Sequence, residues 1–196
     1  MSLILASSSP FRKAILDKLG LDFEVVAPEI NEDRRVNESP IDLVTRLSME
    51  KAVAVAKSKT GLIIASDQIA TLDSGYKAND SVLTKPGSHE NAFLQLKKSS
   101  GKTVNFLTGL VLMNTKNLHT QAHVEHFKVS FKILSDNQIL NYLSKEDVLN
   151  CADSFKSEGL GIALFTKMEG NDPNSLIGLP TIQLIDMLAK ENVHAL

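Results

Sequence analysis

The first twenty residues place an apolar strand, a serine-rich turn and a helix in immediate succession. Leu3–Ala6 is an unbroken apolar run, residues 7–9 are all serine, and an amphipathic stretch follows as far as Gly20. Ser9 is suited to cap the helix, Pro10 to be its first residue and Gly20 to end it. A buried strand that feeds a helix through a tight turn is typical of α/β proteins.

Further strands and helices alternate along the rest of the chain. Leu62–Ala65 is apolar throughout, which is typical of a strand buried on both faces. Turn signals between Asp73 and Gly87 predict a mobile loop or a short hairpin. The order βαβαβ, followed by long strands, predicts an α/β fold with a mixed sheet. The other predicted elements are strands at 22–27, 103–113, 120–133 and 161–165, helices at 40–59, at 88–98, from 135 and from 180, and a polar loop at 169–175.

Size and composition exclude several functional classes. The chain suits a single domain over residues 1–196, and its net charge of −2 lacks the basic excess of a general nucleic-acid binder. Cys151 is the only cysteine, so no intrachain disulfide can form, which suits a reducing cytosol. The apolar runs fall far short of the roughly 20 residues that a membrane-spanning helix needs. We therefore expect a cytoplasmic protein without membrane or nucleic-acid partners.

The serine turn is a candidate phosphate site. The N-terminus of a helix presents free backbone N–H groups and a partial positive charge, which together bind phosphate. Arg12 and Lys13 add cations to the first helical turn, a placement that opposes the helix dipole unless an anion lies there. An ordinary capped helix with solvated basic side chains is the alternative interpretation.

Acidic side chains provide two further candidates. Asp67 follows the apolar strand at 62–65, where open α/β sheets place their ligands, and its carboxylate could hold a divalent metal or deprotonate a water. Glu29, Glu32 and Asp33 form a cluster suited to Mg²⁺ or Mn²⁺ beside a polyphosphate. Each candidate has a simpler interpretation, Asp67 as the cap of a turn and the cluster as a solvated acidic loop.

Three lysines complete the set of candidates. Lys51 lies in a predicted helix, Lys85 in a Lys-Pro-Gly turn that restricts its backbone, and Lys156 beside Ser157. Single lysines are mostly solvated surface residues. The histidines and Cys151 lack zinc-ligand spacing, and the sequence contains neither a P-loop nor a glycine-rich dinucleotide fingerprint. No single compact motif identifies the chemistry.

Taken together and in order, these segments resemble the Maf-type nucleotide pyrophosphatases. The resemblance covers about residues 3–190, and an ordered set of this kind is far more specific than any one motif. The segments that carry it are Leu3–Arg12, Glu32, Glu50–Ala52, Ile64–Gln68, Lys85–Pro86, Thr108–Gly109, Cys151–Gly159, Gly170–Pro173 and Gly178–Pro180.

The resemblance implies hydrolysis of a nucleoside triphosphate to the monophosphate and pyrophosphate, with a divalent cation (Mg²⁺, Mn²⁺ or Co²⁺) as cofactor. It also implies a two-lobed, ITPase-like α/β fold with the active site in the cleft between the lobes, and a homodimer. Glu32 and Asp67 are then the catalytic acidic pair and the metal ligands, with Asp67 as the proton acceptor. The implied phosphate contacts are Ser7, Ser8, Ser9, Arg12, Lys51 and Lys85.

Three positions indicate a branch of this family. Members that act on dTTP and UTP tend to carry two basic residues after Ser-Pro, Thr after the catalytic Asp and Gln in the late glycine-rich segment. Phe11, Gln68 and Glu158 stand at those places, a set similar to the YceF-like branch that acts on 7-methyl-GTP. N7-methylguanine is cationic, so an aromatic ring can stack on it and a carboxylate can accept from its N1–H and amino group. Phe11 as a core residue and Glu158 as a surface carboxylate are the alternatives.

Two other functions stay open at this point. One is a pyrophosphatase for dTTP or UTP, against which the three branch positions argue. The other is a nucleotide-sensing regulator of cell division that acts by binding, although a sensor needs no water-activating carboxylate. Two positions depart from the family pattern, Asn31 where many members carry Asp and Lys13 in place of a second Arg.

Overall fold

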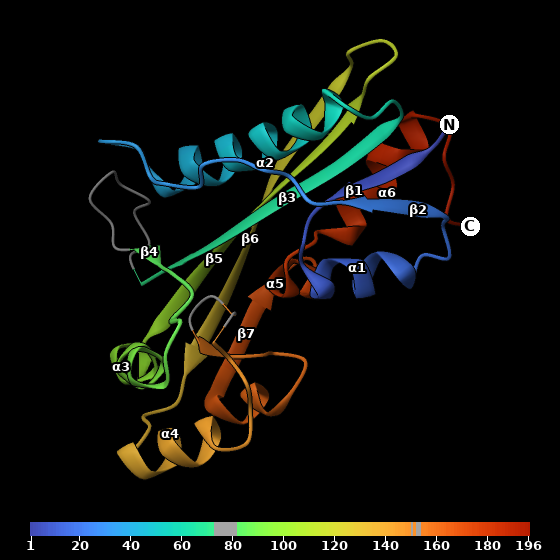
Figure 1. Cartoon of the computed structure of the whole chain (residues 1–196). Helices are drawn as coiled ribbons and strands as arrows, with labels where there is room; N and C mark the ends of the chain where they lie inside the picture. The colour runs from blue at the N-terminus through green and yellow to red at the C-terminus, as the bar shows by residue number, and fades with distance from the viewer. Residues whose placement is uncertain (73–81, 150, 152–153) are drawn as a thin grey trace.

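The computed structural model describes residues 1–72, 82–149, 151 and 154–196 (Figure 1). In this part of the chain a seven-stranded mixed sheet carries helices on both faces. Its strands are β1 (Leu3–Ala6), β2 (Phe23–Val26), β3 (Leu62–Thr71), β4 (Val82–Leu83), β5 (Thr103–Asn114), β6 (Thr120–Phe131) and β7 (Phe165–Gly170). The helices are α1 (Pro10–Asp17), α2 (Pro40–Ala56), α3 (His89–Ser99), α4 (Asp136–Leu143), α5 (Pro173–Ile177) and α6 (Thr181–Lys190), and a 3₁₀ helix spans Leu160–Leu164.

The strands follow the spatial order β2-β1-β3-β5-β6-β7, and β4 pairs with the end of β3. β1 runs parallel to β2 and β3, whereas the β3–β4, β3–β5, β5–β6 and β6–β7 pairs are antiparallel. The α/β class and the mixed sheet predicted from the sequence are confirmed. The predicted caps also hold, since Ser9, Ser39, Ser88 and Ser135 each accept a backbone N–H of the helix that follows. No described helix is long and apolar enough to cross a membrane.

The first lobe packs helices against both faces of β1 and β3. Leu62 and Ile64 lie in a core shared with α1 and α6, whereas Ile63 and Ala65 pack against α2. Alternate side chains of a strand point to opposite faces of the sheet. All four of these side chains are fully buried, on one face or the other. The run is therefore apolar throughout because both faces of the sheet are covered.

The second lobe has a separate core at the other ends of β3, β5 and β6, covered by α3, α4 and β7 (Figure 1). Phe106, Phe131, Phe155 and Phe165 meet edge to face there, with ring centroids 4.8 to 5.6 Å apart. This geometry suits the quadrupoles of aromatic rings. The separate cores at the two ends of the sheet confirm the two-lobed architecture.

Strand β3 is longer than predicted and runs through both lobes. The strand expected at 62–65 continues to Thr71, because β5 pairs with β3 along its whole length. Asp67 therefore lies in mid-strand, and the prediction that it follows the end of the strand was wrong. On its other edge β3 pairs with β1 at 62–65 and with β4 at 70–71. Within the described residues, 66–69 have no strand neighbour on that edge, and the gap lies between the lobes.

Two predictions near the C-terminus were also wrong. The strand expected at 161–165 is the 3₁₀ helix, and the strand follows it as β7. Because β7 is the edge of the sheet and most of its side chains are exposed, it lacks the apolar alternation that marks a strand in sequence. The polar loop expected at 169–175 contains the start of α5, with Asp172 as N-cap and Pro173 as first residue.

The segment from Asp73 to Gly87 is described only in its second half. β4 pairs with the end of β3, placing Leu83 opposite Ala70, so strand pairing does form at the base of the expected hairpin. The remainder of that prediction, over residues 73–81, lies outside the described residues.

Helix α2 lies directly on Gly109 of β5. A Cβ at this position would be 2.4 Å from Ser48 Oγ and 2.8 Å from the carbonyl oxygen of Val44, both on α2. Only glycine allows so close an approach. Asp67 is the register partner of Gly109, and its N–H donates to the same Ser48 hydroxyl at 3.0 Å. The absence of a side chain at Gly109 thus allows α2 to lie close to Asp67.

Substitution of Gly109 tests this packing. Gly109→Ala is expected to lower the free energy of unfolding by about 1–3 kcal/mol, as overpacking in a well-filled interior does. Urea denaturation measures the change. Lys116→Ala, in the exposed turn after the same strand, is the control and should stay within about 0.5 kcal/mol of the wild type. A Gly109→Ala protein as stable as this control would contradict the close approach of α2.

Candidate active site

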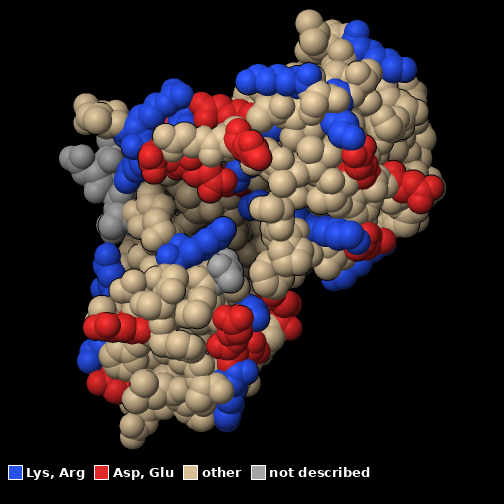
Figure 2. Space-filling model, viewed as in Figure 1, with Lys and Arg blue, Asp and Glu red and all other residues tan. Residues whose placement is uncertain are grey.

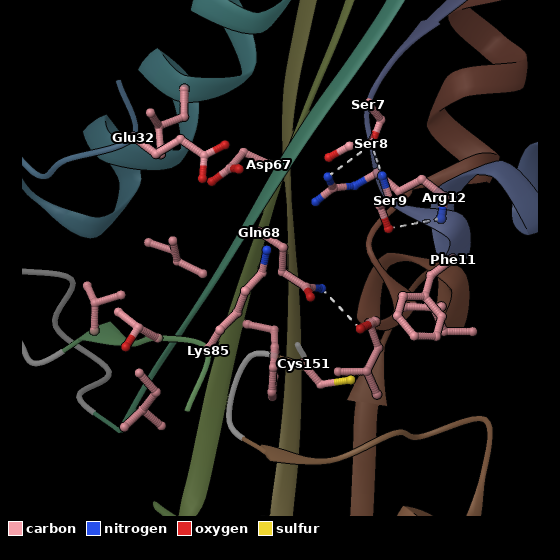
Figure 3. A pocket seen from close by; sticks show the side chains of 18 of the residues that line it. Ser7, Ser8, Ser9, Phe11, Arg12, Glu32, Asp67, Gln68, Lys85 and Cys151 are labelled. Atoms are coloured by element: carbon pink, nitrogen blue, oxygen red, sulfur yellow. Dashed lines mark hydrogen bonds between the residues drawn. The ribbon is translucent and has the colours of Figure 1, made fainter. Parts of the chain in front are cut away.

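A cleft of about 1030 Å³ opens between the lobes beside residues 66–69 of β3 (Figures 2 and 3). The first lobe contributes the β1–α1 turn, the segment before α2, and α2 itself. The second lobe contributes β4, the turn after it and residues between 147 and 158. Every site residue that the family resemblance implies lines this cleft, namely Ser7, Ser8, Ser9, Phe11, Arg12, Glu32, Lys51, Asp67, Gln68, Lys85 and Glu158.

The serine turn presents the start of α1 to the cleft. Ser7 is buried, and its Oγ accepts the N–H of Ser9 at 3.1 Å and Nη1 of Arg12 at 3.5 Å. Ser9 Oγ accepts the Arg12 N–H at 3.4 Å, while Ser8 is exposed. Figure 3 shows the three serines beside the Arg12 side chain. A helix N-terminus flanked by hydroxyls and a guanidinium is a suitable site for an anion.

A backbone carbonyl fixes the Arg12 guanidinium. Arg12 Nε donates to the carbonyl oxygen of Gly178 at 2.8 Å, and Ser66 Oγ donates to the same oxygen at 2.8 Å. Gly178 ends α5 with a φ of 120°, in the region that favours glycine. Burial lowers the pKa of Arg12, although the charges of Asp67 and Glu32 oppose this. An anion in the cleft would offset the effect of burial.

The ammonium of Lys51 lies between two carboxylates at the centre of the cleft. Lys51 Nζ is 2.5 Å from Asp67 Oδ1 and 2.7 Å from Glu32 Oε1. The side chains of Lys51 and Asp67 are 7% and 10% exposed, whereas that of Glu32 is 56% exposed. A buried ammonium requires such partners. Because an ammonium has three donors, one stays available to a further acceptor.

Glu32 is favoured in its ionised form here. Partial burial raises its pKa, but the hydrogen bond and charge of Lys51, with the charges of Lys85 and Arg12, outweigh burial and lower the pKa of Glu32 overall. Lys85 extends into the cleft from the turn after β4 (Figure 3). The cleft therefore combines two carboxylates with several cations.

Arg46 of α2 anchors the segment that carries Glu32. Its Nε and Nη2 donate to the two carboxylate oxygens of Glu38 at 2.5 and 2.9 Å, and Nη2 also donates to the carbonyl of Asp33 at 2.9 Å. The hydrogen bonds from Arg46 are the main reason that the pKa of Glu38 falls to about 2. Because Asp33 follows Glu32, α2 binds this segment twice, at the backbone through Arg46 and at the Glu32 carboxylate through Lys51.

Phe11 and Glu158 reach the cleft from different lobes. Phe11 lies on the first turn of α1, and Glu158 is exposed on the segment before the 3₁₀ helix. Lys156 joins them, with its Nζ 6.0 Å from the centroid of the Phe11 ring. Lys156 was one of the three candidate lysines of the sequence, without an assigned role, and the structure places it in the cleft. Cys151 also lines the cleft, and burial raises the pKa of its thiol to about 11.

The amide of Gln68 connects β3 to α5. Its Nε2 lies within hydrogen-bonding distance of three oxygens, the carbonyl of Ser175 at 2.7 Å, Thr108 Oγ1 at 3.0 Å and the carbonyl of Leu176 at 3.1 Å. Figure 3 shows this side chain with its amide nitrogen turned toward α5. The nitrogen is thus occupied within the protein, and the amide oxygen is the group that Gln68 can offer to a ligand.

The structure does not bring the acidic trio of the sequence together. Glu32 and Asp33 line the cleft, but Glu29 does not, and Lys13 forms an ion pair within its own helix instead of facing the cleft. No group of three or more His, Cys, Asp or Glu suited to a metal occurs in the described part of the chain. The carboxylates that meet are Glu32 and Asp67, from segments far apart in sequence.

The chain is similar to known proteins in both sequence and structure. The Maf-like protein family matches residues 2–191. The chain belongs to the Maf family. A 7-methyl-GTP pyrophosphatase from Alcanivorax borkumensis is 51% identical, over 98% of this chain and 95% of its own length. One from Pseudoalteromonas atlantica is also 51% identical, over 97% of this chain and 95% of its own.

A solved structure supports the fold alone. The Ham1 protein of Staphylococcus aureus superposes with a TM-score of 0.54 at 13% identity, covering 98% of this chain and 100% of that chain. This likeness agrees with the fold expected from the resemblance.

The carboxylate pair of this Maf protein fits a hard divalent cation. Mg²⁺ is bound in many enzymes by one or two carboxylates, with phosphate and water as its other ligands. Glu32 and Asp67 supply two such carboxylates, and both already meet one cation, the Lys51 ammonium. A structural zinc site would require a closed set of four protein ligands, which this pair does not provide.

The Glu38–Arg46 pair predicts how stability depends on pH. Because the pKa of Glu38 is about 2 in the folded chain and about 4.3 when unfolded, its contribution is complete above pH 4.3 and is lost as the pH falls toward 2. Glu38→Gln should lower the free energy of unfolding at pH 7 by about 2 kcal/mol. Urea denaturation from pH 7 to pH 3 should show the wild type and the variant converging. Glu29→Gln, outside the cleft, is the control, and a constant difference between Glu38→Gln and wild type across this range would refute the assignment.

Proposed function

We propose that this Maf protein hydrolyses 7-methyl-GTP to 7-methyl-GMP and diphosphate, and so removes a modified nucleotide from the pool. The observation that carries the proposal is the Lys51 ammonium held between Glu32 and Asp67, in a cleft that also contains a helix N-terminus. The relatives named as 7-methyl-GTP pyrophosphatases, which match nearly the whole chain, support the choice of substrate.

The triphosphate binds on the side of the cleft formed by the β1–α1 turn. The backbone N–H groups at the start of α1 and the hydroxyls of the turn receive phosphate oxygens. Arg12, Lys51 and Lys85 offset the negative charge that these oxygens bring and that grows in the transition state. Lys51 has one donor left for this purpose while it holds both carboxylates.

Asp67 accepts the proton of the attacking water. Its carboxylate is buried and oriented by Lys51, and its backbone is fixed by Ser48, so it is held in one position at the cleft. The oxygen of one water attacks the α-phosphorus as the proton of that water passes to Asp67. The bond between the α-phosphorus and the bridging oxygen breaks, and diphosphate leaves. Glu32 and Asp67 would also hold a divalent cation (Mg²⁺, Mn²⁺ or Co²⁺), which supplies further charge neutralisation at the phosphates.

The base lies between Phe11 and Glu158. The Phe11 ring offers an aromatic face to the cationic N7-methylguanine, and the Glu158 carboxylate accepts from N1–H and the amino group. The amide oxygen of Gln68 adds a third acceptor. All these groups come from one chain, so the proposal does not require the homodimer that the family resemblance implies.

Removal of the proton acceptor tests the chemistry. Asp67→Asn should lower kcat by about 10²- to 10⁴-fold, the usual contribution of general base catalysis, while nucleotide binding is retained. Pyrophosphate release measures turnover, and calorimetry with a non-hydrolysable analogue measures binding. Asp17→Asn, on the outer face of α1, is the charge-matched control and should keep full activity. Unchanged turnover of Asp67→Asn would refute the role of Asp67.

A substrate screen with Mg²⁺, Mn²⁺ or Co²⁺ tests the base site. The wild type should prefer 7-methyl-GTP over GTP, dTTP and UTP, and Phe11→Arg with Glu158→Gln should lose about tenfold or more of that preference. Glu169→Gln, on the exposed edge strand, should leave it unchanged. A wild-type preference for dTTP or UTP would overturn the base assignment but keep the pyrophosphatase reaction. Binding of nucleotides without release of pyrophosphate would instead favour a sensor.

A further inference from the structure

The segment that carries Lys156 and Glu158 has no regular secondary structure before the 3₁₀ helix begins at Leu160. Phe155, buried in the core of the second lobe, anchors its start, and the N–H of Gly159 donates to the carbonyl of Lys156 within it. Two side chains from α4 and the turn after it bond its backbone from outside. The hydroxyl oxygen of Tyr142 accepts the backbone N–H of Lys156 at 3.2 Å, and Glu146 Oε1 accepts the backbone N–H of Leu160 at 2.8 Å.

Glu146 contacts this segment at three points. Besides its bond to Leu160, its Oε2 lies 3.8 Å from Lys156 Nζ, on the lysine that also approaches the Phe11 ring. The Glu146 carboxylate further lies against Gly159, where a Cβ would be only 2.5 Å from Oε1. Its side chain is 19% exposed, so these contacts are formed largely out of solvent. Glu158 lies between the residues that Glu146 holds.

We propose that Glu146 is a positioning residue for base selectivity. It does not line the cleft, and it acts by fixing the backbone at Leu160, two residues after Glu158, and by drawing the Lys156 ammonium, two residues before it. A carboxylate recognises two N–H groups of a base only when its position is fixed, because small displacements weaken both hydrogen bonds together. Attraction of Lys156 toward Glu146 also offsets the repulsion between that ammonium and a cationic base at Phe11. This inference rests on the proposed recognition of 7-methylguanine by Phe11 and Glu158.

The test is the ratio of kcat/KM for 7-methyl-GTP to kcat/KM for GTP. Glu146→Ala should lower this ratio by about fivefold or more, mainly through KM for the methylated substrate. Glu146→Gln keeps an oxygen for the Leu160 N–H and should restore at least half of the wild-type ratio. Glu169→Ala removes an exposed carboxylate of the same lobe and should leave the ratio unchanged.

Gly159→Ala perturbs the same contact from the other side. The added methyl group displaces the end of a flexible Glu146 side chain rather than backbone, so the protein is expected to fold. Gly159→Ala should lower the ratio of kcat/KM values as Glu146→Ala does. The double variant that carries both substitutions should lower the ratio no further than either single variant, since both substitutions break the same contact between Glu146 and the segment at Gly159. Thermal denaturation of each variant confirms that the folded protein is assayed.

The outcomes separate the two proposals. A wild type that does not distinguish 7-methyl-GTP from GTP overturns base recognition and, with it, this role of Glu146. A wild type that does distinguish them, with both single variants keeping its ratio within about twofold, leaves the proposed function intact and overturns the positioning role. An equal loss of kcat/KM for both substrates has the same meaning, since a merely structural contact would act on both alike.

Discussion

The pairing of β3 with β5 along ten residues is the interaction on which the rest of the structure depends. Both lobes build their cores on these two strands, and the other partners of β3 occupy only its two ends. Among the residues that the structure describes, the cleft lies where β3 has a strand neighbour on one edge alone. A ligand bound there therefore lies against a strand that is itself held by its full ladder of hydrogen bonds.

The charges of the cleft are arranged around this strand. Asp67 projects from β3 toward α2, where Lys51 meets it, and Gly109 lets the helix come close enough for that contact. Glu32 reaches the same ammonium from a segment without regular structure, which Arg46 holds to α2. Opposite charges thus stabilise one another before any nucleotide arrives.

Much of this could be predicted from the sequence. The caps, the buried strand at 62–65 and the order of the motifs indicated the fold class, and every proposed site residue lines one cleft. Local patterns failed where pairing with a distant strand decides the structure. The extension of β3 past Ala65 includes Ser66, Asp67 and Gln68. Their polar side chains do not predict a buried strand, and the strand forms there because β5 pairs with it.

Contacts between segments far apart in sequence could not be predicted for a similar reason. The separation in sequence between Glu146 and the segment it holds gives no periodic signal, and Lys156 looks like any surface lysine until the fold brings it to Phe11. Likewise, the edge strand β7 carries exposed side chains and shows no alternation. Such features depend on tertiary structure, which overrides local propensity.

The continuity of β3 and β5 through both lobes has a consequence for the thermodynamics of binding. Lobes joined by a flexible linker must be ordered when a ligand closes them, and that loss of conformational freedom weakens affinity. Here the lobes share an uninterrupted hydrogen-bonded ladder, so strands rather than a linker connect them before the ligand enters. Binding then has no linker between the lobes to order, and more of the interaction with the nucleotide is expressed as affinity.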